Sequence, residues 1–364
     1  MNNKQTNQYF PDYLVTPGDV LEDHLAVIGM SQVELATRTG LAKKTVNEII
    51  KGKASITAET AVKLERVLGR PSRFWMNLES NYQEDLVRLE QKSRMLSNLE
   101  WLDRFPIKEM MKLEWLPSSK DKIAQAEILL NFFGVASPAQ WESIWSNSCV
   151  AFRQSVRYQI CNEAVCAWLR QGELEARKIT STTYDEKSFK GILEGLRKLT
   201  QEEDPQVFIR ELTGLCASVG VIVVFIPELP KTRTCGAVRW INGKPVIQLS
   251  LRYKTNDHLW FSFFHEVGHI LKHGRKLLFL EMSEKEVESN YETEADIFAS
   301  NCLIPLPELQ KFLDQGKITP SKIRDFAQCI EIAPGIVVGR LQHDRHIPFS
   351  ACNELKISYS WKHS

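Results

Sequence analysis

The segment His265–His269 constrains this chain more than any other part of its sequence. Its two histidines are four residues apart, so on a helix they lie one turn apart on the same face and can both reach one tetrahedral metal ion. The motif lies in an apolar part of the helix expected over Asn256–His273. Glu266 would point to a water molecule in the open fourth position of the metal. The pattern H-E-x-x-H therefore predicts a zinc site, with Glu266 as the general base.

A third ligand distinguishes such a site from a chance H-E-x-x-H whose histidines are structural. Glu292 lies 23 residues after His269 and begins the sequence E-x-x-A-D on a second expected helix. Asp296, one turn further, is placed to accept a hydrogen bond from a ligand imidazole. Three ligands on one straight helix cannot surround a metal, so we expect His273 to be structural or at the rim. The predicted ligands are His265, His269 and Glu292.

Small residues at the expected contact between these two helices favour the same arrangement. Gly268 would let a neighbouring backbone approach the first helix closely, and Ala295 and Ala299 would let the second helix come near. A structural zinc is normally closed by four protein ligands, often cysteines, and no cysteine cluster lies near His265. This argues against a third interpretation, a helical scaffold with a structural metal.

The hydrophobic period changes along the chain and predicts the fold class. The spacing is helical from residue 17 to about 219, whereas Gly220–Ile226 is rich in β-branched residues. Cys235–Ile241 and Pro245–Ser250 flank Asn242-Gly243, a strong hairpin signal. We expect a multidomain, mainly α protein with an all-α N-terminal helix-turn-helix, a helical middle region and a C-terminal α+β domain with a small sheet. The expected boundaries are a polar tail (1–16), the helix-turn-helix domain (17–90), the middle region (91–204), the α+β domain (205–345) and a C-terminal tail (346–364).

Residues 31–50 carry the pattern of a helix-turn-helix. Ser31 is a good N-cap for the first helix, and Gly40 allows the left-handed turn that follows it. Val46 and Ile49 would seat the second helix on the core, which leaves its opposite face exposed.

That exposed face carries Lys43, Lys44 and Asn47, where such a helix meets base edges in DNA. The residues expected to contact phosphates are Gln32, Thr45, Lys51 and Lys53. Residues 30–73 hold nine basic and four acidic residues, a balance of +5 in a chain whose net charge is +1. Lysines on a helix are also typical of a scaffold that contacts only protein. The local charge favours a double-stranded DNA operator as partner.

Composition excludes several other classes of protein. The net charge of +1 excludes a uniformly basic nucleic-acid coat. Val221–Ile226, the longest apolar run, is far shorter than the roughly 18 residues of a membrane span, and the N-terminus lacks the apolar core of a signal peptide. Eight cysteines lie in apolar segments without a C-x-x-C pair, which predicts buried thiols rather than disulfides. We expect a cytoplasmic protein with no membrane partner.

Two parts of the chain resemble known families. The first resembles the HigA-like antitoxins of the Xre/Cro family over about 70 residues, in Pro17-Gly18, Ser31–Ala36, Gly52, Ile56-Thr57, Ala61 and Phe74-Trp75. The second, from about 205 to 345, resembles the ImmA/IrrE family of zinc metallopeptidases, a minimal gluzincin fold, in Phe264–His269, Glu292–Asp296, Leu303-Ile304-Pro305 and Pro334–Leu341. One departure is His258, where an arginine or a similar residue is common in that family.

These resemblances imply a site and partners. The second implies Zn²⁺ bound by His265, His269 and Glu292, catalysis by Glu266, and a repressor-like protein as substrate. The first implies a homodimer on two DNA half-sites and a toxin as partner. Together they predict a DNA-binding transcriptional regulator with a zinc-dependent endopeptidase domain, which cleaves a repressor or another regulatory protein in stress response or mobile-element control. The alternative is an antitoxin and autorepressor of a toxin–antitoxin module whose zinc domain is a binding or structural element; the intact Glu266 favours the enzyme.

Two further expectations concern the substrate. The strand Val246–Ser250 is expected at a sheet edge near the active helix, where an extended protein segment could add as a further strand. Tyr253, His343 and His346 are alternative candidates for the residue that holds the oxyanion, and the sequence does not choose among them.

Overall fold

The computed structural model describes residues 14–96, 98–146, 162–232, 234–273 and 285–361. The chain divides into two compact units, Met1–Asn98 (unit 1) and Leu99–Ser364 (unit 2). Each unit has a hydrophobic core of its own. The expected middle region 91–204 is therefore divided, because its first residues belong to the last helix of unit 1 and the rest to unit 2. The expected polar tail lies outside the described residues up to residue 13.

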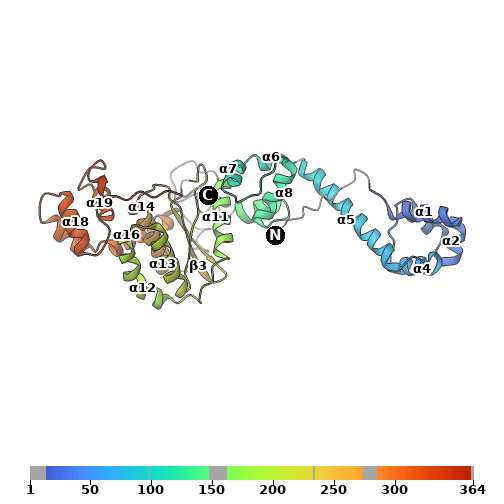
Figure 1. The fold of residues 1–364 in the computed structure, drawn as a ribbon, viewed down its shortest axis with the longest axis horizontal. Coiled ribbons are helices and arrows are strands. Elements are labelled where there is room, and N and C mark those ends of the chain that lie inside the picture. Colours follow the sequence, from blue (N-terminus) through green and yellow to red (C-terminus); the bar gives the residue numbers. More distant parts are fainter. Residues whose placement is uncertain (1–13, 97, 147–161, 233, 274–284, 362–364) are drawn as a thin grey trace. The chain divides into compact units, whose positions relative to one another are not determined.

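Unit 1 is a helical bundle in the residues that the structure describes (Figure 1). Its helices are α1 (Pro17–Ile28), α2 (Gln32–Thr39), α3 (Lys43–Ile50), α4 (Ala58–Leu68) and α5 (Ser72–Leu96). The hydroxyl of Ser31 accepts a hydrogen bond from the Glu34 amide at 3.1 Å, as expected of an N-cap. Gly40 and Gly69 end their helices with φ of 70° and 72°, in the left-handed region.

The core of unit 1 joins α3 to the other helices. Val46 and Ile49 are 1% and 2% exposed, and Trp75 of α5 is fully buried. At Gly18, α1 passes so close to the end of α3 that a Cβ atom would lie 2.3 Å from the carbonyl oxygen of Ile49. This close approach holds α3 in place and leaves its opposite face to solvent.

Over its described residues, unit 2 combines helices with one small sheet, which confirms the predicted mainly α, multidomain fold. Its first helices are α6 (Leu99–Leu102), α7 (Ile107–Lys112), α8 (Lys122–Phe133), α9 (Pro138–Trp141), the π-helix η1 (Glu142–Ser146), α11 (Asn162–Ala176), α12 (Glu186–Lys198), the 3₁₀ turn η2 (Leu199–Gln201) and α13 (Pro205–Ser218). After the sheet come α14 (Asn256–Gly268), the π-helix η3 (His269–His273), α16 (Lys285–Leu303), α17 (Leu306–Leu313), α18 (Pro320–Cys329), α19 (Pro334–His343) and the 3₁₀ turn η5 (Asn353–Leu355).

The sheet has the order β1-β3-β2, formed by β1 (Ile222–Phe225), β2 (Gly236–Ile241) and β3 (Lys244–Leu249). β2 and β3 form the expected antiparallel hairpin, while β1 pairs with β3 in parallel. The expectation that Val246–Ser250 forms a sheet edge is wrong, because β3 is paired on both sides. Backbone groups that already bond to two strands cannot receive a further one.

Helix α11 of the expected middle region lies against this sheet (Figure 1). The indole of Trp168 donates to the carbonyl of Ile226 at 3.1 Å, and the side-chain amide of Gln248 donates to the carbonyl of Trp168 at 2.7 Å. The part of the middle region that holds α11 is therefore built into the same unit as the sheet and α14.

Helix α14 is buried along one stripe and anchored at its start. Trp260, Phe263, Phe264 and Val267 follow helical spacing and are at most 1% exposed. A residue of the expected C-terminal tail contacts the start of this helix: the ammonium of Lys356 donates to the Asp257 carboxylate at 2.6 Å. A sequence pattern does not reveal this contact, because the two residues are far apart in the chain.

The cysteines depart in part from the expectation of buried thiols. Cys216 is a free, buried thiol and Cys329 is free but exposed. Cys166 is in a disulfide, whereas Cys149 and Cys161 lie outside the described residues. The spacing of cysteines in a sequence does not say which of them the fold brings together. Among the described residues, no helix is long and apolar enough to cross a membrane.

Candidate metal centre

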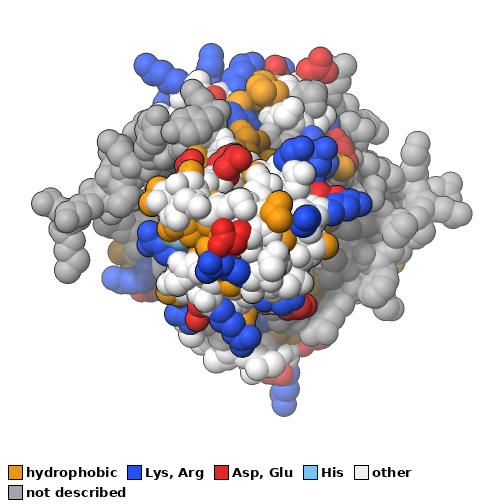
Figure 2. Space-filling view, turned by 90° about the vertical axis from the view of Figure 1, so that its right-hand side faces the viewer, with side chains coloured by type: hydrophobic (Ala, Val, Ile, Leu, Met, Phe, Trp, Pro, Cys, Tyr) orange, Lys and Arg blue, Asp and Glu red, His pale blue; other side chains and the backbone are white. Residues whose placement is uncertain are grey.

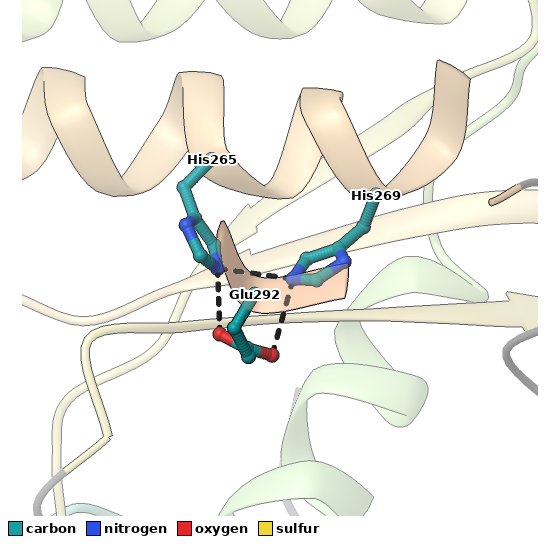
Figure 3. A group of neighbouring side chains, drawn as sticks. All are labelled: His265, His269 and Glu292. Carbon is teal, nitrogen blue, oxygen red and sulfur yellow. Dashed lines mark hydrogen bonds and ion pairs between the residues drawn. The ribbon is translucent and has the colours of Figure 1, made fainter. Parts of the chain in front are cut away.

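Three side chains from two helices converge in unit 2 (Figure 3). The Nε2 atoms of His265 and His269 are 3.0 Å apart. Those atoms lie 3.2 Å and 3.4 Å, respectively, from the two carboxylate oxygens of Glu292 on α16. His269 is buried, and the other two residues are half-buried. The structure thus brings together the three ligands that the sequence predicts.

Asp296 holds the outer nitrogen of the first histidine. Its carboxylate oxygen lies 2.8 Å from Nδ1 of His265. A carboxylate accepts, so this Nδ1 carries a proton, which leaves Nε2 as the atom that would bind a metal. This hydrogen bond fixes the orientation of the imidazole, as the position of Asp296 in the sequence suggests.

Glu266 is buried next to the same centre. The residue is 7% exposed, and its carboxylate lies against the backbone of Gly236 at the start of β2: a Cβ atom on Gly236 would lie 2.7 Å from Oε1 of Glu266. Burial raises the pKa of the Glu266 carboxyl above its ordinary value. The side chain is therefore a stronger base than a solvated carboxylate.

The spacing between α14 and α16 depends on small residues. A Cβ atom on Gly268 would lie 3.1 Å from Cα of Ala295 and 3.2 Å from Cδ1 of Phe298. Ala295 and Ala299 are fully buried in the contact between the two helices. The close approach expected at Gly268 is present, and it brings Glu292 within reach of both histidines.

The electrostatics of the three residues favour a positive charge among them. Burial lowers the pKa of His265, but hydrogen bonds to Asp296 and Glu292 outweigh it and raise that pKa to about 10. Burial raises the pKa of Glu292, but its hydrogen bonds to the two histidines reverse this and hold the pKa well below its usual range. The same negative carboxylates would stabilise a metal cation placed among these atoms.

The donor set fits zinc. Zinc–ligand bonds of about 2.0–2.1 Å in a tetrahedron separate the ligand atoms by roughly 3.3 Å. The observed separations of 3.0, 3.2 and 3.4 Å lie close to that value. Two nitrogens and one carboxylate also form a catalytic donor set, since such sites keep a fourth position open.

The candidates for the oxyanion residue remain outside this group. Tyr253 is half exposed and stacks on His258, with ring centroids 4.3 Å apart. His343 contacts Asp344 and is exposed, as is His346. Within the described residues, none of the three candidates has a hydrogen bond to a predicted ligand.

The sequence did not predict the contacts of two further residues near the candidate metal centre. His273, expected to be structural or at the rim, is 5% exposed and its Nδ1 lies 3.1 Å from Nδ1 of His269. Glu294 lies 3.1 Å from Nε2 of His273 and was not singled out. Its position two residues after Glu292 was the only available signal.

In unit 1 the predicted DNA-contacting side chains lie on and around α3. Lys43, Lys44 and Asn47 are exposed on that helix, and Thr45 is half-buried. Gln32 is half-buried at the first position of α2, whereas Lys51 and Lys53 are exposed just after α3. Figure 2 shows the face of the molecule that carries α2 and α4, on which basic side chains lie among acidic ones. The Lys44 ammonium, for example, lies 3.7 Å from the Glu48 carboxylate.

Two families match the chain. A helix-turn-helix family matches residues 28–75, and the IrrE N-terminal-like domain family matches residues 218–331. The first match spans α2, α3 and α4, and the second contains both helices of the metal centre. The fold and these matches define a helix-turn-helix protein with a metallopeptidase-like domain.

Similar curated proteins match the N-terminal part of the chain. Virulence-associated protein I of Dichelobacter nodosus is 32% identical over 84 residues, which is 23% of this chain and 76% of that protein. The uncharacterized HTH-type transcriptional regulator YddM of Escherichia coli is 34% identical over 64 residues, 18% of this chain and 68% of that protein. Antitoxin HigA-1 of Vibrio cholerae is 31% identical over 97 residues, 22% of this chain and 91% of that protein.

Two solved structures are also similar. A putative antidote protein of a plasmid maintenance system from Nostoc punctiforme is 27% identical, with a TM-score of 0.23, and covers 23% of this chain and 92% of its own. An addiction module antidote protein of the HigA family from Coxiella burnetii is 29% identical, with a TM-score of 0.21, and covers 23% of this chain and 91% of its own. Through the curated relatives and the two family matches, the chain belongs to the Xre-like helix-turn-helix family and carries an ImmA/IrrE-like domain. Both predicted resemblances are confirmed.

Proposed function

We propose that the chain is a DNA-binding transcriptional regulator whose second unit is a zinc-dependent endopeptidase acting on a regulatory protein in stress response or mobile-element control. The observation that carries the proposal is the group of His265, His269 and Glu292, whose ligand atoms all lie within 4.8 Å of one another beside a buried Glu266. The DNA-binding part of the proposal is supported by the exposed outer face of α3, which lies in a locally basic part of the sequence.

The residues of the site have separate roles in hydrolysis. Zinc, when bound, supplies Lewis acidity to a peptide carbonyl and lowers the pKa of a water molecule towards about 7. Glu266 accepts the proton of the attacking water and passes it to the leaving amine. His265, His269 and Glu292 hold the metal, and Asp296 keeps the His265 imidazole in the orientation that the ligand needs.

The zinc content of the purified protein tests the metal site. We expect about one zinc ion per chain after purification without chelator, and its loss in His265→Ala and in Glu292→Ala, because each change removes one of only three ligands. Elemental mass spectrometry measures this directly. Glu308→Ala, which removes an ion-paired carboxylate on α17, is the control and should keep its zinc. A wild-type protein without zinc would contradict the proposal and favour the antitoxin alternative.

DNA recognition is proposed for the outer face of α3. Two lysines occupy the first turn of this helix, where the positive end of the helix dipole makes cations unfavourable, and its N-cap Ala42 provides no side-chain hydrogen bond. This arrangement suits an anionic partner such as a phosphate backbone. We propose a homodimer, because helix-turn-helix proteins commonly read two half-sites one helical turn apart.

Replacing Lys44 and Asn47 with alanine is expected to weaken specific DNA binding by roughly 30-fold or more, because two contacts to base edges are removed and each is worth about 1–3 kcal/mol. Electrophoretic mobility shifts with fragments of the native locus measure the effect at physiological salt. Lys63→Ala on α4, whose ammonium is 2.7 Å from the Glu59 carboxylate, is a charge-matched control. If no fragment binds to the wild-type chain, the DNA-binding part of the proposal fails.

The antitoxin alternative draws on a specific finding, the similarity to antitoxin HigA-1. In that function, unit 1 would autoregulate an operon of a toxin–antitoxin module, and the zinc domain would be a binding or structural element rather than an enzyme. Stable binding of a protein encoded at the same locus, without its cleavage, would favour this alternative.

A further inference from the structure

His273 is buried beside the second ligand and is not explained by the roles assigned so far. Its side chain is 1% exposed, and its ring lies 4.3 Å from the ring of Tyr291 on α16. It ends the π-helix η3, which begins at His269. Short π-helices occur frequently at functional sites.

For a neutral His273, the hydrogen bonds around the ring admit one assignment of protons. The Glu294 carboxylate lies 3.1 Å from Nε2 of His273 and can only accept, so that Nε2 carries the proton. In the neutral imidazole, Nδ1 is then the acceptor. Nδ1 of His269, 3.1 Å away, must therefore be the donor. This leaves Nε2 of His269, which lies 3.4 Å from Glu292, as the atom that would bind a metal.

The opposite tautomer of His273, protonated at Nδ1, is unfavourable. A proton on Nδ1 of His273 would leave its Nε2 lone pair facing the negative oxygen of Glu294, which is repulsive. His269 would then have to accept at Nδ1 and carry its proton on Nε2, the atom that lies 3.4 Å from Glu292 and has to be free for a metal.

We propose that Glu294 and His273 are positioning residues that act in series on His269. The proposal rests on the proposed metal site. Glu294 fixes the tautomer of His273, and His273 fixes the tautomer and ring orientation of His269. For His265, the Asp296 carboxylate fixes the ring directly, with its oxygen 2.8 Å from Nδ1 of the histidine. The two histidine ligands thus depend on two separate carboxylates of α16.

Zinc affinity, measured by competition with a chromophoric chelator, tests this series. His273→Phe keeps an aromatic ring against Tyr291 but removes the acceptor for His269, and we expect zinc binding to weaken about 10- to 100-fold. Glu294→Ala changes a largely exposed side chain, so the fold should persist, and we expect a smaller loss of affinity. Adding Glu294→Ala to His273→Phe should weaken binding no further, because Glu294 acts only through His273. Glu308→Ala is the matched control and should bind zinc like the wild type.

Two results would overturn the proposal. One is that both single variants bind zinc within twofold of the wild type. The other is that the two losses multiply in the double variant, which would mean that Glu294 acts independently of His273. Thermal melting of the metal-free variants shows whether a loss of affinity reflects unfolding.

A second readout does not need the metal. Imidazole ¹⁵N spectra of the metal-free, histidine-labelled protein should show His269 protonated at Nδ1 and His273 protonated at Nε2. A His269 protonated at Nε2 alone would refute the proposal. This experiment also separates the two failures: a wild-type chain that binds no zinc but shows the expected tautomers would overturn the proposed metal site and leave the series intact.

Discussion

Glu266→Gln should lower the rate of peptide cleavage by roughly 10²- to 10⁴-fold, the usual contribution of a general base. Glutamine has the same shape as glutamate but cannot accept the proton of the attacking water. Glu266 is not a predicted ligand, so the zinc content should equal that of the wild type. Burying a neutral amide costs less than burying a carboxylate, so the melting temperature should not fall.

The measurement is the cleavage of regulatory proteins encoded at the same locus, followed by gel electrophoresis and mass spectrometry. Glu308→Gln, the same chemical change on the surface of α17, should cleave like the wild type. A Glu266→Gln protein that cleaves at the wild-type rate would remove the general-base assignment. A wild-type protein that holds zinc and cleaves none of these proteins would argue for a binding role.

Gly18→Ala should destabilise unit 1 by roughly 3 kcal/mol, at the upper end of the range for overpacking. The new methyl group would lie 2.3 Å from the carbonyl oxygen of Ile49 and 2.5 Å from that of Ile50. Both atoms belong to the backbone of α3, so α1 has to move away from it. Since the cores of the two units share no residue, zinc content should remain unchanged.

Gly214→Ala is the matched control, because this glycine lies exposed in the middle of α13 with no atom within 4 Å of a new Cβ. It should stabilise unit 2 by up to about 1 kcal/mol, the helix propensity difference between the two residues. Thermal melting followed by circular dichroism, together with DNA binding, measures both variants. If Gly18→Ala melts and binds DNA like the wild type, the close contact of α1 with α3 does not support unit 1.

Features set by short-range geometry could be predicted from the sequence. H-E-x-x-H places two imidazoles on one helix face, and the sequence beginning at Glu292 supplies a carboxylate on a helix with small residues. The hairpin at Asn242-Gly243 followed from the need for two residues with positive φ, which are 50° and 79° in the structure. These patterns predict elements because they depend on neighbours within a few residues.

Features that depend on distant neighbours could not be predicted in the same way. The hydrophobic pattern of Val246–Ser250 indicates a strand but not its order in the sheet, and the strand turned out to be central. Glu294 acts on His269 only through the ring orientation of His273, which no spacing rule contains. The Lys356–Asp257 contact joins residues that the sequence separates widely.

The contact at Gly268 also bears on which ions the proposed metal site would accept. The Glu292 carboxylate oxygens lie 3.2 Å and 3.4 Å from the two histidine nitrogens because α14 and α16 approach closely at this glycine. Bonds of about 2.0–2.1 Å fit a triangle of this size, whereas calcium needs about 2.3–2.6 Å and more oxygen ligands. A side chain at position 268 would move α16 outwards and enlarge the triangle. If the proposed zinc site is correct, its selection by ionic radius would therefore depend on helix packing as well as on ligand chemistry.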